Sequence, residues 1–370
     1  MNAMTRASRG ALIGALTIGA GACAAGGGFA LRGAEGVAPE DAAAQARFPA
    51  DLVMLGRTDE QADGTRRIGW VGSGFTVRAA GPVTVTMTDS GGNRFDVFEG
   101  DGTRILVPQA GTHAYTLGAE GVTQTITLRR RSESISAGLT TIDAVEAYGT
   151  EPVAMPERRI LFLGDSITAG FGVTGPDEHC GYDVDTSSVQ DTYAVMAAQA
   201  FGADYHIIAI SGRGAIYNYD DHPDPNMAAH VTMALPDTAG TWDASAWTPD
   251  IVVINLGTND WSTYDPGTTF AGNYTGILVE LAGTYPDAEI LSLTGPLLEG
   301  DQEKAIEDGV AVAIERAKRQ GVDARAVAIH LPEDGEVYGC SRHPNVRAMR
   351  HMADQVIPEI AAETGWTPEG

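Results

Sequence analysis

The chain has 370 residues, 43% of them hydrophobic, and carries 24 basic against 49 acidic residues. Its formal charge of −25 argues against nucleic acid as a partner, because a phosphate backbone is bound through a basic surface. The length and the apolar fraction are sufficient for two hydrophobic cores. We therefore expect a globular protein with two domains.

Residues 1–22 have the layout of a secretory signal peptide. Arg6 and Arg9 precede the apolar run 11–18, and the small residues 20–22 provide a cleavage site. The apolar run is too short to span a membrane. We therefore expect an exported protein, either periplasmic or extracellular.

Cys23 follows the small residues directly and resembles the lipid-attachment site of bacterial lipoproteins, although Ala20 stands where a leucine is usual. Lipidation of Cys23 would anchor the protein to the bacterial outer membrane without spanning it. The sequence leaves both states of Cys23 open.

The next two segments predict a tether and a β-sandwich. Residues 23–50 are rich in alanine and glycine, which is typical of a flexible tether. Residues 51–150 contain short runs of period 2, such as Val83, Val85 and Met87 alternating with threonines, and many short alternating strands indicate a sandwich. The run 129–131 of three arginines is interpreted as a solvated strand end.

Residues 156–370 alternate strand and helix patterns, which predicts a parallel sheet in a three-layer α/β domain. The expected strands are 160–163, 208–210, 251–254, 289–293 and 326–329. The expected helices are 190–201, 268–284, 301–320 and 346–363.

Ser166 follows the first of these strands. The apolar run 160–163 predicts a buried strand, and Gly164 and Asp165 place the serine at its C-terminal tip, where open α/β sheets bind ligands. A helix beginning there would direct its free N–H groups toward a negative charge beside the serine. Ser166 is therefore a candidate nucleophile; the alternative is that this turn only caps a helix.

Three later segments agree with the first interpretation. The second strand ends in Ser-Gly-Arg-Gly at 211–214, the third in Gly-Thr-Asn-Asp at 257–260, and His-Pro-Asn stands at 343–345. Together with the Gly-Asp-Ser turn, this ordered set resembles the four sequence blocks of the SGNH (GDS-type) hydrolases.

The resemblance implies that His343 is the base that activates the hydroxyl of Ser166. It also implies an oxyanion hole formed by the backbone N–H groups of Ser166 and Gly212 and by the side-chain amide of Asn259. His222, which also precedes a proline, lies in a polar loop outside these blocks and is not chosen.

The two-domain layout from about residue 51 onward resembles carbohydrate esterase family 2. The segments that carry this resemblance are 56–58, 70–75, 89–95, 218–219, 242–243, 295–296 and 339–340. The resemblance implies an N-terminal jelly roll and a serine esterase that removes O-acetyl groups from a polysaccharide of the xylan or glucomannan type. It implies no metal and no other cofactor, and it implies an acetylated poly- or oligosaccharide as the partner.

The two residues that follow Asn259, Asp260 and Trp261, are candidates for substrate binding. Trp261 either forms an apolar wall for a sugar or acetyl group or belongs to the core. Asp260 stands at the same strand tip and is also a weaker candidate for orienting His343.

Cys180 and Cys340 flank the serine and histidine blocks. In an oxidising compartment we expect them to form a disulfide that fastens the serine loop to the histidine loop. The alternative is a pair of buried thiols.

The sequence departs from the family that it resembles in the residues just before the histidine. Related hydrolases place an aspartate two or three residues before the histidine, whereas here Ser341 and Cys340 occupy those positions and no acid lies between Glu336 and His343. We therefore expect a Ser166–His343 dyad in which a main-chain carbonyl around Cys340–Ser341 orients the histidine. The hydroxyl of Ser341 is the alternative orienting group.

Two other functions remain open. The missing aspartate favours a carbohydrate-binding protein whose hydrolase domain has decayed. An esterase of the same type could also act on peptidoglycan acetate or on lipid, although the sequence has no long apolar lid that would favour lipid.

Overall fold

The computed structural model describes residues 47–222, 225–236 and 238–369, all within one compact unit. The expected signal peptide, Cys23 and most of the expected tether lie outside the described residues. Within the described ranges, no helix is long and apolar enough to cross a membrane.

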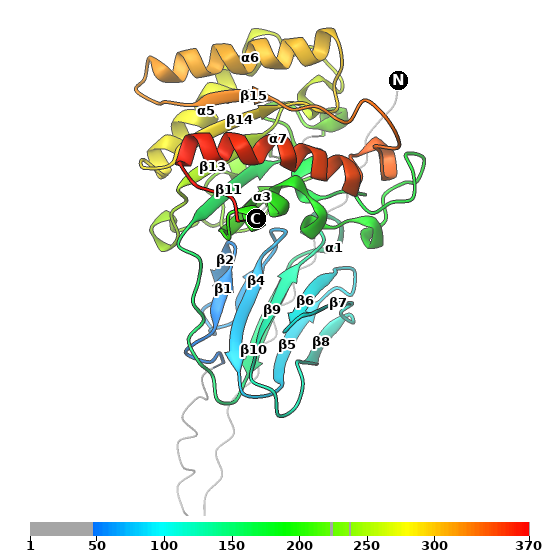
Figure 1. The fold of residues 1–370 in the computed structure, drawn as a ribbon, viewed down its shortest axis with the longest axis vertical. Coiled ribbons are helices and arrows are strands. Elements are labelled where there is room, and N and C mark those ends of the chain that lie inside the picture. Colours follow the sequence, from blue (N-terminus) through cyan, green and yellow to red (C-terminus); the bar gives the residue numbers. More distant parts are fainter. Residues whose placement is uncertain (1–46, 223–224, 237, 370) are drawn as a thin grey trace, which may run out of the picture. The chain divides into compact units, whose positions relative to one another are not determined.

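The first part of this unit contains two five-stranded antiparallel sheets (Figure 1). The strand order of one sheet is β1 (Val53–Leu55), β4 (Gly74–Ala79), β9 (Gln124–Arg130), β6 (Phe95–Glu99) and β7 (Gly102–Leu106). The order of the other is β2 (Thr58–Glu60), β3 (Arg66–Ile68), β10 (Thr140–Glu146), β5 (Val83–Asp89) and β8 (Gly111–Leu117).

Apolar side chains from both sheets fill one core, so the two sheets form a sandwich. In β5, Val83, Val85 and Met87 are fully buried, whereas the threonines between them are partly exposed. The predicted alternation in this segment is therefore confirmed. The jelly-roll connectivity stays a prediction.

The end of the expected tether belongs to the sandwich instead. Phe48 packs against its core, and the carbonyl of Arg47 accepts a hydrogen bond of 2.8 Å from the N–H of Val145. Residues 47–50 are therefore held by the sheet edge.

The interpretation of the arginine run 129–131 as a solvated strand end is wrong. Arg130 is fully buried and donates to the carbonyls of Ser132 (2.8 Å) and Gly138 (2.9 Å). Arg129 lies over the ring of Tyr205, at 4.2 Å from its centroid, and Arg131 pairs with Asp96 at 2.8 Å. The sequence hid the contacts of Arg129 and Arg131 because Tyr205 and Asp96 lie far away along the chain.

The second part is a five-stranded parallel sheet covered by helices on both faces, as predicted. Its strand order is β12 (Asp204–Ala209), β11 (Arg159–Gly164), β13 (Ile251–Asn255), β14 (Glu289–Thr294) and β15 (Arg325–Ala328). Its longer helices are α3 (Tyr193–Ala200), α5 (Thr268–Thr284), α6 (Asp301–Lys318) and α7 (Val346–Thr364). The short α-helices of the whole unit are α1 (Ser134–Ala137), α2 (Ser166–Ala169) and α4 (Met227–His230). Its 3-10 turns are η1 (Val184–Thr186), η2 (Val189–Asp191), η3 (Tyr219–Asp221), η4 (Ala244–Ala246), η5 (Asn259–Trp261) and η6 (Cys340–Arg342).

The inner strand β11 shows why a continuous apolar run is needed here. Ile160 and Phe162 point into the core that contains α3 and α7, whereas Leu161 and Leu163 point into the core that contains α5 and α6. All four side chains are fully buried, because both faces of a parallel sheet are covered.

The strand order creates a switch point at β11. The chain passes from β11 to β12 on one side and then to β13 on the other side. The loops after β11 and β13 therefore separate at the carboxyl edge, which is where open α/β sheets form ligand-binding crevices. Ser166 follows β11, and Asn259 follows β13.

Candidate active site

Ser166 stands at the first position of α2, directly after β11. The side chain of Asp165 caps this helix by accepting a hydrogen bond of 3.0 Å from the N–H of Ile167. A Cβ on Gly164 would meet the hydroxyl of Thr168 at 2.1 Å, so the turn needs a glycine. Because Asp165 performs the capping, the hydroxyl of Ser166 is left for other contacts.

His343 meets that hydroxyl. Its Nε2 lies 2.8 Å from Oγ of Ser166, and its Nδ1 lies 3.2 Å from the carbonyl oxygen of Ser341. Since a carbonyl can only accept, Nδ1 carries the hydrogen and Nε2 is left to accept the serine proton. The structure thus places the expected carbonyl at the ring.

The other expected orienting groups lie elsewhere. The hydroxyl of Ser341 is directed to the carbonyl of Cys180, at 3.3 Å, and Asp260 is engaged by another loop. Within the described ranges, the ring nitrogens of His343 have no carboxylate partner.

The environment of His343 favours the neutral ring. Burial lowers the pKa of His343 below its usual value, and hydrogen bonding to the backbone at Ser341 and Cys340 opposes this shift. The ring also packs on Phe171, with 4.4 Å between the ring centroids. A neutral imidazole is the form that can accept a proton from a serine.

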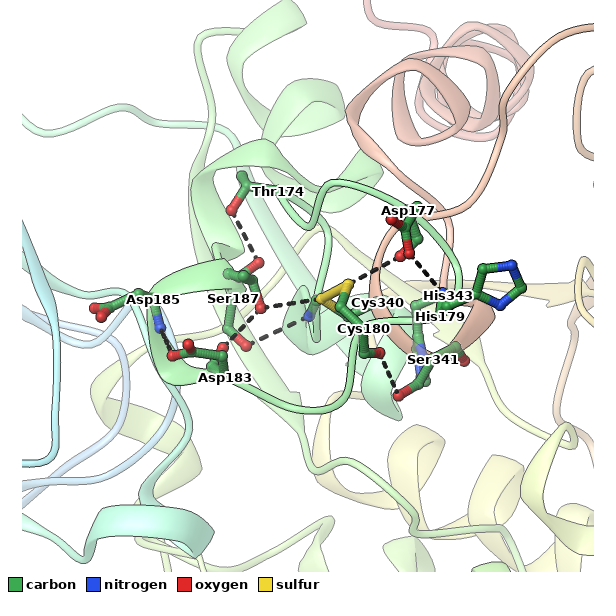
Figure 2. The surroundings of a disulfide bond; sticks show 12 residues. Thr174, Asp177, His179, Cys180, Asp183, Asp185, Ser187, Cys340, Ser341 and His343 are labelled. Carbon is green, nitrogen blue, oxygen red and sulfur yellow. Dashed lines mark hydrogen bonds between the residues drawn. A yellow bond between two sulfur atoms is a disulfide. The ribbon is translucent and has the colours of Figure 1, made fainter.

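The loop that carries His343 is tied to the serine side of the site (Figure 2). Cys340 forms a disulfide with Cys180, and its N–H donates to the carbonyl of Gly172 at 3.0 Å. The N–H of Ser341 donates to the carbonyl of Cys180 at 2.8 Å. Ser341 itself has a positive φ of 52°, an uncommon conformation that these contacts hold in place.

The expected oxyanion donors follow three neighbouring strands of the parallel sheet, β11, β12 and β13. The first N–H groups of a helix have no intrahelical acceptor, and Ser166 opens α2. Gly212 has a φ of +77°, and within the described residues its N–H has no hydrogen-bond acceptor. Nδ2 of Asn259 lies 3.1 Å from Oδ2 of Asp165 and 3.0 Å from the carbonyl of Arg213. These two contacts position the Asn259 amide and engage both of its N–H groups, so donation to an oxyanion requires that one of them be shared or exchanged.

Asp260 is buried and does not line the cleft, so its interpretation as a substrate-binding residue is wrong. Its side chain is 1% exposed and accepts the N–H groups of Ala215 (2.9 Å), Ile216 (2.7 Å) and Tyr217 (3.0 Å). Burial raises the pKa of Asp260 to about 6, whereas these three hydrogen bonds oppose the rise. Asp260 therefore shapes the loop that follows Gly212.

Trp261 belongs to the core, as the alternative interpretation proposed. It is 7% exposed and packs edge-on against Phe270, with 4.7 Å between the centroids. It does not line the cleft described next.

A cleft of about 460 Å³ opens above Ser166 and His343. Its walls combine polar and apolar side chains: Tyr219, Thr258, Asn259, Ser262, Leu297, Leu298, Glu299, Gln302, Tyr338, Ser341 and Arg342. A larger hollow of about 690 Å³ lies beside α7, but its lining contains no serine or cysteine nucleophile. We therefore assign the site to the smaller cleft, which is lined by Ser166 and His343.

No group of three metal-ligating side chains is close enough together to hold a metal ion within residues 47–222, 225–236 and 238–369.

Sequence reasoning missed two contacts in this region. Phe171 stacks on His343, and Glu133 of the sandwich binds Ser211, 78 positions away in sequence. No local pattern signals either contact, because each depends on chain segments that meet only in the folded protein.

Residues 162–367 match the model of the GDSL-like Lipase/Acylhydrolase family. The match covers more than half of the chain, and the chain therefore belongs to this family.

Two relatives of the chain are named as esterases. The chain is 33% identical over 213 residues to a cellulase/esterase, CelE, of Acetivibrio thermocellus, which covers 57% of this chain and 26% of that protein. It is 26% identical over 331 residues to an acetylxylan esterase / glucomannan deacetylase of Cellvibrio japonicus, covering 85% and 89% of the two chains. The chain thus spans about a quarter of the first relative and most of the second.

The fold has a solved counterpart. A family two carbohydrate esterase from Clostridium thermocellum, determined in complex with cellohexaose, superposes with a TM-score of 0.78 at 28% identity. The match covers 85% of this chain and 99% of that one, so it includes the sandwich as well as the α/β part.

We predict that replacing both cysteines, as Cys180→Ser with Cys340→Ser, lowers the free energy of unfolding by about 2–4 kcal/mol. The bridge closes a long loop, with a sequence separation of 160. Denaturant unfolding measures this loss. Non-reducing peptide mapping of the parent protein should recover the cross-linked peptide, and finding both thiols free would contradict the assignment.

Proposed function

We propose that this protein is a serine esterase that removes O-acetyl groups from a polysaccharide of the xylan or glucomannan type. The observation that carries the proposal is the 2.8 Å contact between Nε2 of His343 and Oγ of Ser166 beneath an open cleft. The names of the relatives support the choice of substrate.

The proposed reaction has two halves. Oγ of Ser166 attacks the acetyl carbonyl while Nε2 of His343 takes the serine proton, and the carbonyl oxygen becomes an oxyanion near the N–H groups of Ser166 and Gly212 and the amide of Asn259. The bond between the acetyl carbon and the sugar oxygen then breaks, and the imidazolium gives its proton to this oxygen, which leaves as a hydroxyl. Water hydrolyses the acetyl-serine by the reverse proton transfers, releasing acetate.

A dyad is sufficient for this chemistry in our proposal. The carbonyl of Ser341 holds the tautomer of His343, which is one task of the aspartate in a triad. It does not supply the full negative charge that stabilises the imidazolium. The alcohol leaving group of an ester departs more readily than an amine, so less help is needed.

Features of the cleft support a saccharide rather than a lipid chain. The cleft is open, and its lining includes the hydroxyl, amide and carboxylate residues Ser262, Gln302 and Glu299 as well as Tyr219. Sugars are bound by such mixtures, because they offer apolar ring faces and many hydroxyl groups. A fatty acyl chain would need a longer apolar surface.

We further propose that the protein is exported. Acetylated polysaccharides lie outside the cell, and the disulfide between Cys180 and Cys340 would persist in an oxidising compartment. The N-terminal pattern of residues 1–22 agrees with this location.

The test compares the parent protein with Ser166→Ala. The parent should release acetate from acetylated xylan or glucomannan and hydrolyse 4-nitrophenyl acetate, whereas Ser166→Ala should lose both activities and remain folded, because only a hydroxyl is removed. Acetylated peptidoglycan serves as the comparison substrate. Parent-like turnover by Ser166→Ala would refute the nucleophile. Saccharide binding without hydrolysis by the parent would favour the non-catalytic alternative.

Ser341→Ala should change kcat by less than about fivefold, because the carbonyl rather than the hydroxyl meets His343 and a net hydrogen bond contributes only about 1 kcal/mol. Steady-state hydrolysis of 4-nitrophenyl acetate measures the effect. A loss of several orders of magnitude would make the Ser341 hydroxyl the third catalytic member.

The pH profile should show an acid limb below the ordinary histidine pKa of about 6.5. Only neutral His343 can accept the serine proton, and burial lowers its pKa. Activity is therefore lost as pH falls through this lowered pKa, so kcat/KM at pH 6.5 should exceed half of its plateau. A midpoint at or above 6.5 in the measured profile of kcat/KM would contradict this expectation.

A further inference from the structure

Glu133 is a buried acid that the proposed reaction does not use. It belongs to the connection between β9 and β10 of the sandwich, and its side chain is only 4% exposed. Burial raises the pKa of Glu133, whereas its hydrogen bonds to Ser211 and the nearby charges of Arg130 and Arg213 oppose the rise. A buried carboxylate is costly unless it is paired, so its contacts are informative.

Two hydrogen bonds tie this carboxylate to one residue of the α/β part. Oε1 accepts a hydrogen bond of 2.6 Å from the N–H of Ser211, and Oε2 accepts one of 2.5 Å from its hydroxyl. This bidentate arrangement restricts both the backbone and the side chain of Ser211, and hydrogen bonds to a charged acceptor are among the stronger ones.

Ser211 directly precedes Gly212, the expected oxyanion donor. The carbonyl of Ser211 and the N–H of Gly212 belong to one planar peptide group, so restricting Ser211 limits the rotation of that N–H. On the other side, the carbonyl of Gly212 accepts a hydrogen bond of 2.7 Å from the N–H of Tyr219. Hydrogen bonds therefore restrain the chain on both sides of the Ser211–Gly212 peptide group, and those at Ser211 come from Glu133.

The segment that carries Glu133 is itself rigid. Arg130 donates to the carbonyl of Ser132 before it and to that of Gly138 after it, at 2.8 and 2.9 Å. The third donor nitrogen of Arg130 reaches the hydroxyl of Thr140, at 2.9 Å. The fully buried guanidinium thus closes the loop from inside the sandwich and fixes the position of Glu133.

We propose that Glu133 is a positioning residue through which the sandwich sets the geometry of the oxyanion hole. Glu133 holds Ser211 so that the N–H of Gly212 faces the acetyl oxygen in the transition state. The sandwich therefore contributes to catalysis as well as to stability. This inference rests on the proposed esterase function.

The central experiment compares Glu133→Ala with Glu133→Gln. Alanine removes both contacts, so kcat for 4-nitrophenyl acetate should fall by about tenfold to a hundredfold while KM changes by less than about twofold, as expected for a misplaced transition-state donor. Glutamine can accept from the N–H of Ser211 and donate to its hydroxyl, so Glu133→Gln should keep kcat within about threefold of the parent. If Glu133→Ala does not fold, Glu133→Asp, whose shorter side chain cannot reach both atoms, takes its place.

Asp96→Ala is the matched control. Asp96 is also a buried carboxylate of the sandwich whose pKa is raised by burial, but it pairs with Arg131 and not with the loop at Ser211. This variant should lower the melting temperature without changing kcat. An equal fall in kcat for Asp96→Ala and Glu133→Ala would show a general loosening and overturn the proposal.

Two further outcomes would also overturn it. Parent-like kcat in folded Glu133→Ala would show that the contacts do not matter for turnover. A kcat as low in Glu133→Gln as in Glu133→Ala would show that the charge acts, not the contacts.

The proposed function is tested separately, by the parent protein. If the parent hydrolyses no acetyl ester, the esterase assignment fails. The rate at which a fluorophosphonate labels Ser166 still compares the variants in that case, because phosphonylation places a developing negative oxygen in the same hole.

Discussion

The hydrogen bond between Ser166 and His343 joins residues 177 positions apart, and the architecture of the α/β part depends on bringing them together. Ser166 is positioned by the inner strand β11, whose residues 160–164 are buried in the sheet. His343 comes from a loop that precedes α7 and lies outside the sheet. The position of a loop is fixed only by specific contacts. Here these contacts are the disulfide at Cys340 and the hydrogen bonds to Gly172 and Cys180.

Buried carboxylates organise the other loops of the site. Asp165 accepts the N–H of Ile167, Asp260 accepts three N–H groups of the next loop, and Glu133 accepts that of Ser211. Burial raises the pKa of Asp165 to about 7, and the charges of Asp260 and Glu133 add to the rise. Acids this close together repel one another, so each needs backbone donors to remain charged. The same donors fix the loops that surround the nucleophile.

The sandwich takes part in this arrangement through the strand β9 and the residues that follow it. Arg129 stacks on Tyr205 of β12, Arg131 lies near Asp191, and Glu133 reaches Ser211. The solved family two carbohydrate esterase from Clostridium thermocellum matches the chain across both parts. The two parts of this protein are accordingly linked by buried charged and aromatic contacts close to the site.

The sequence by itself determined the strands of the parallel sheet, the main helices and the position of Ser166 after the first of these strands. These depend on local patterns, such as the apolar run 160–163 and the turn at Gly164, and the ordered blocks led to His343 and the carbonyl beside it. The roles of Trp261, Asp260 and Arg130 were decided only by the tertiary structure. A tryptophan after a strand tip can face a cleft or a core, and a charged side chain can be solvated or buried. Which outcome occurs depends on partners from distant segments, and a local pattern contains no information about those partners.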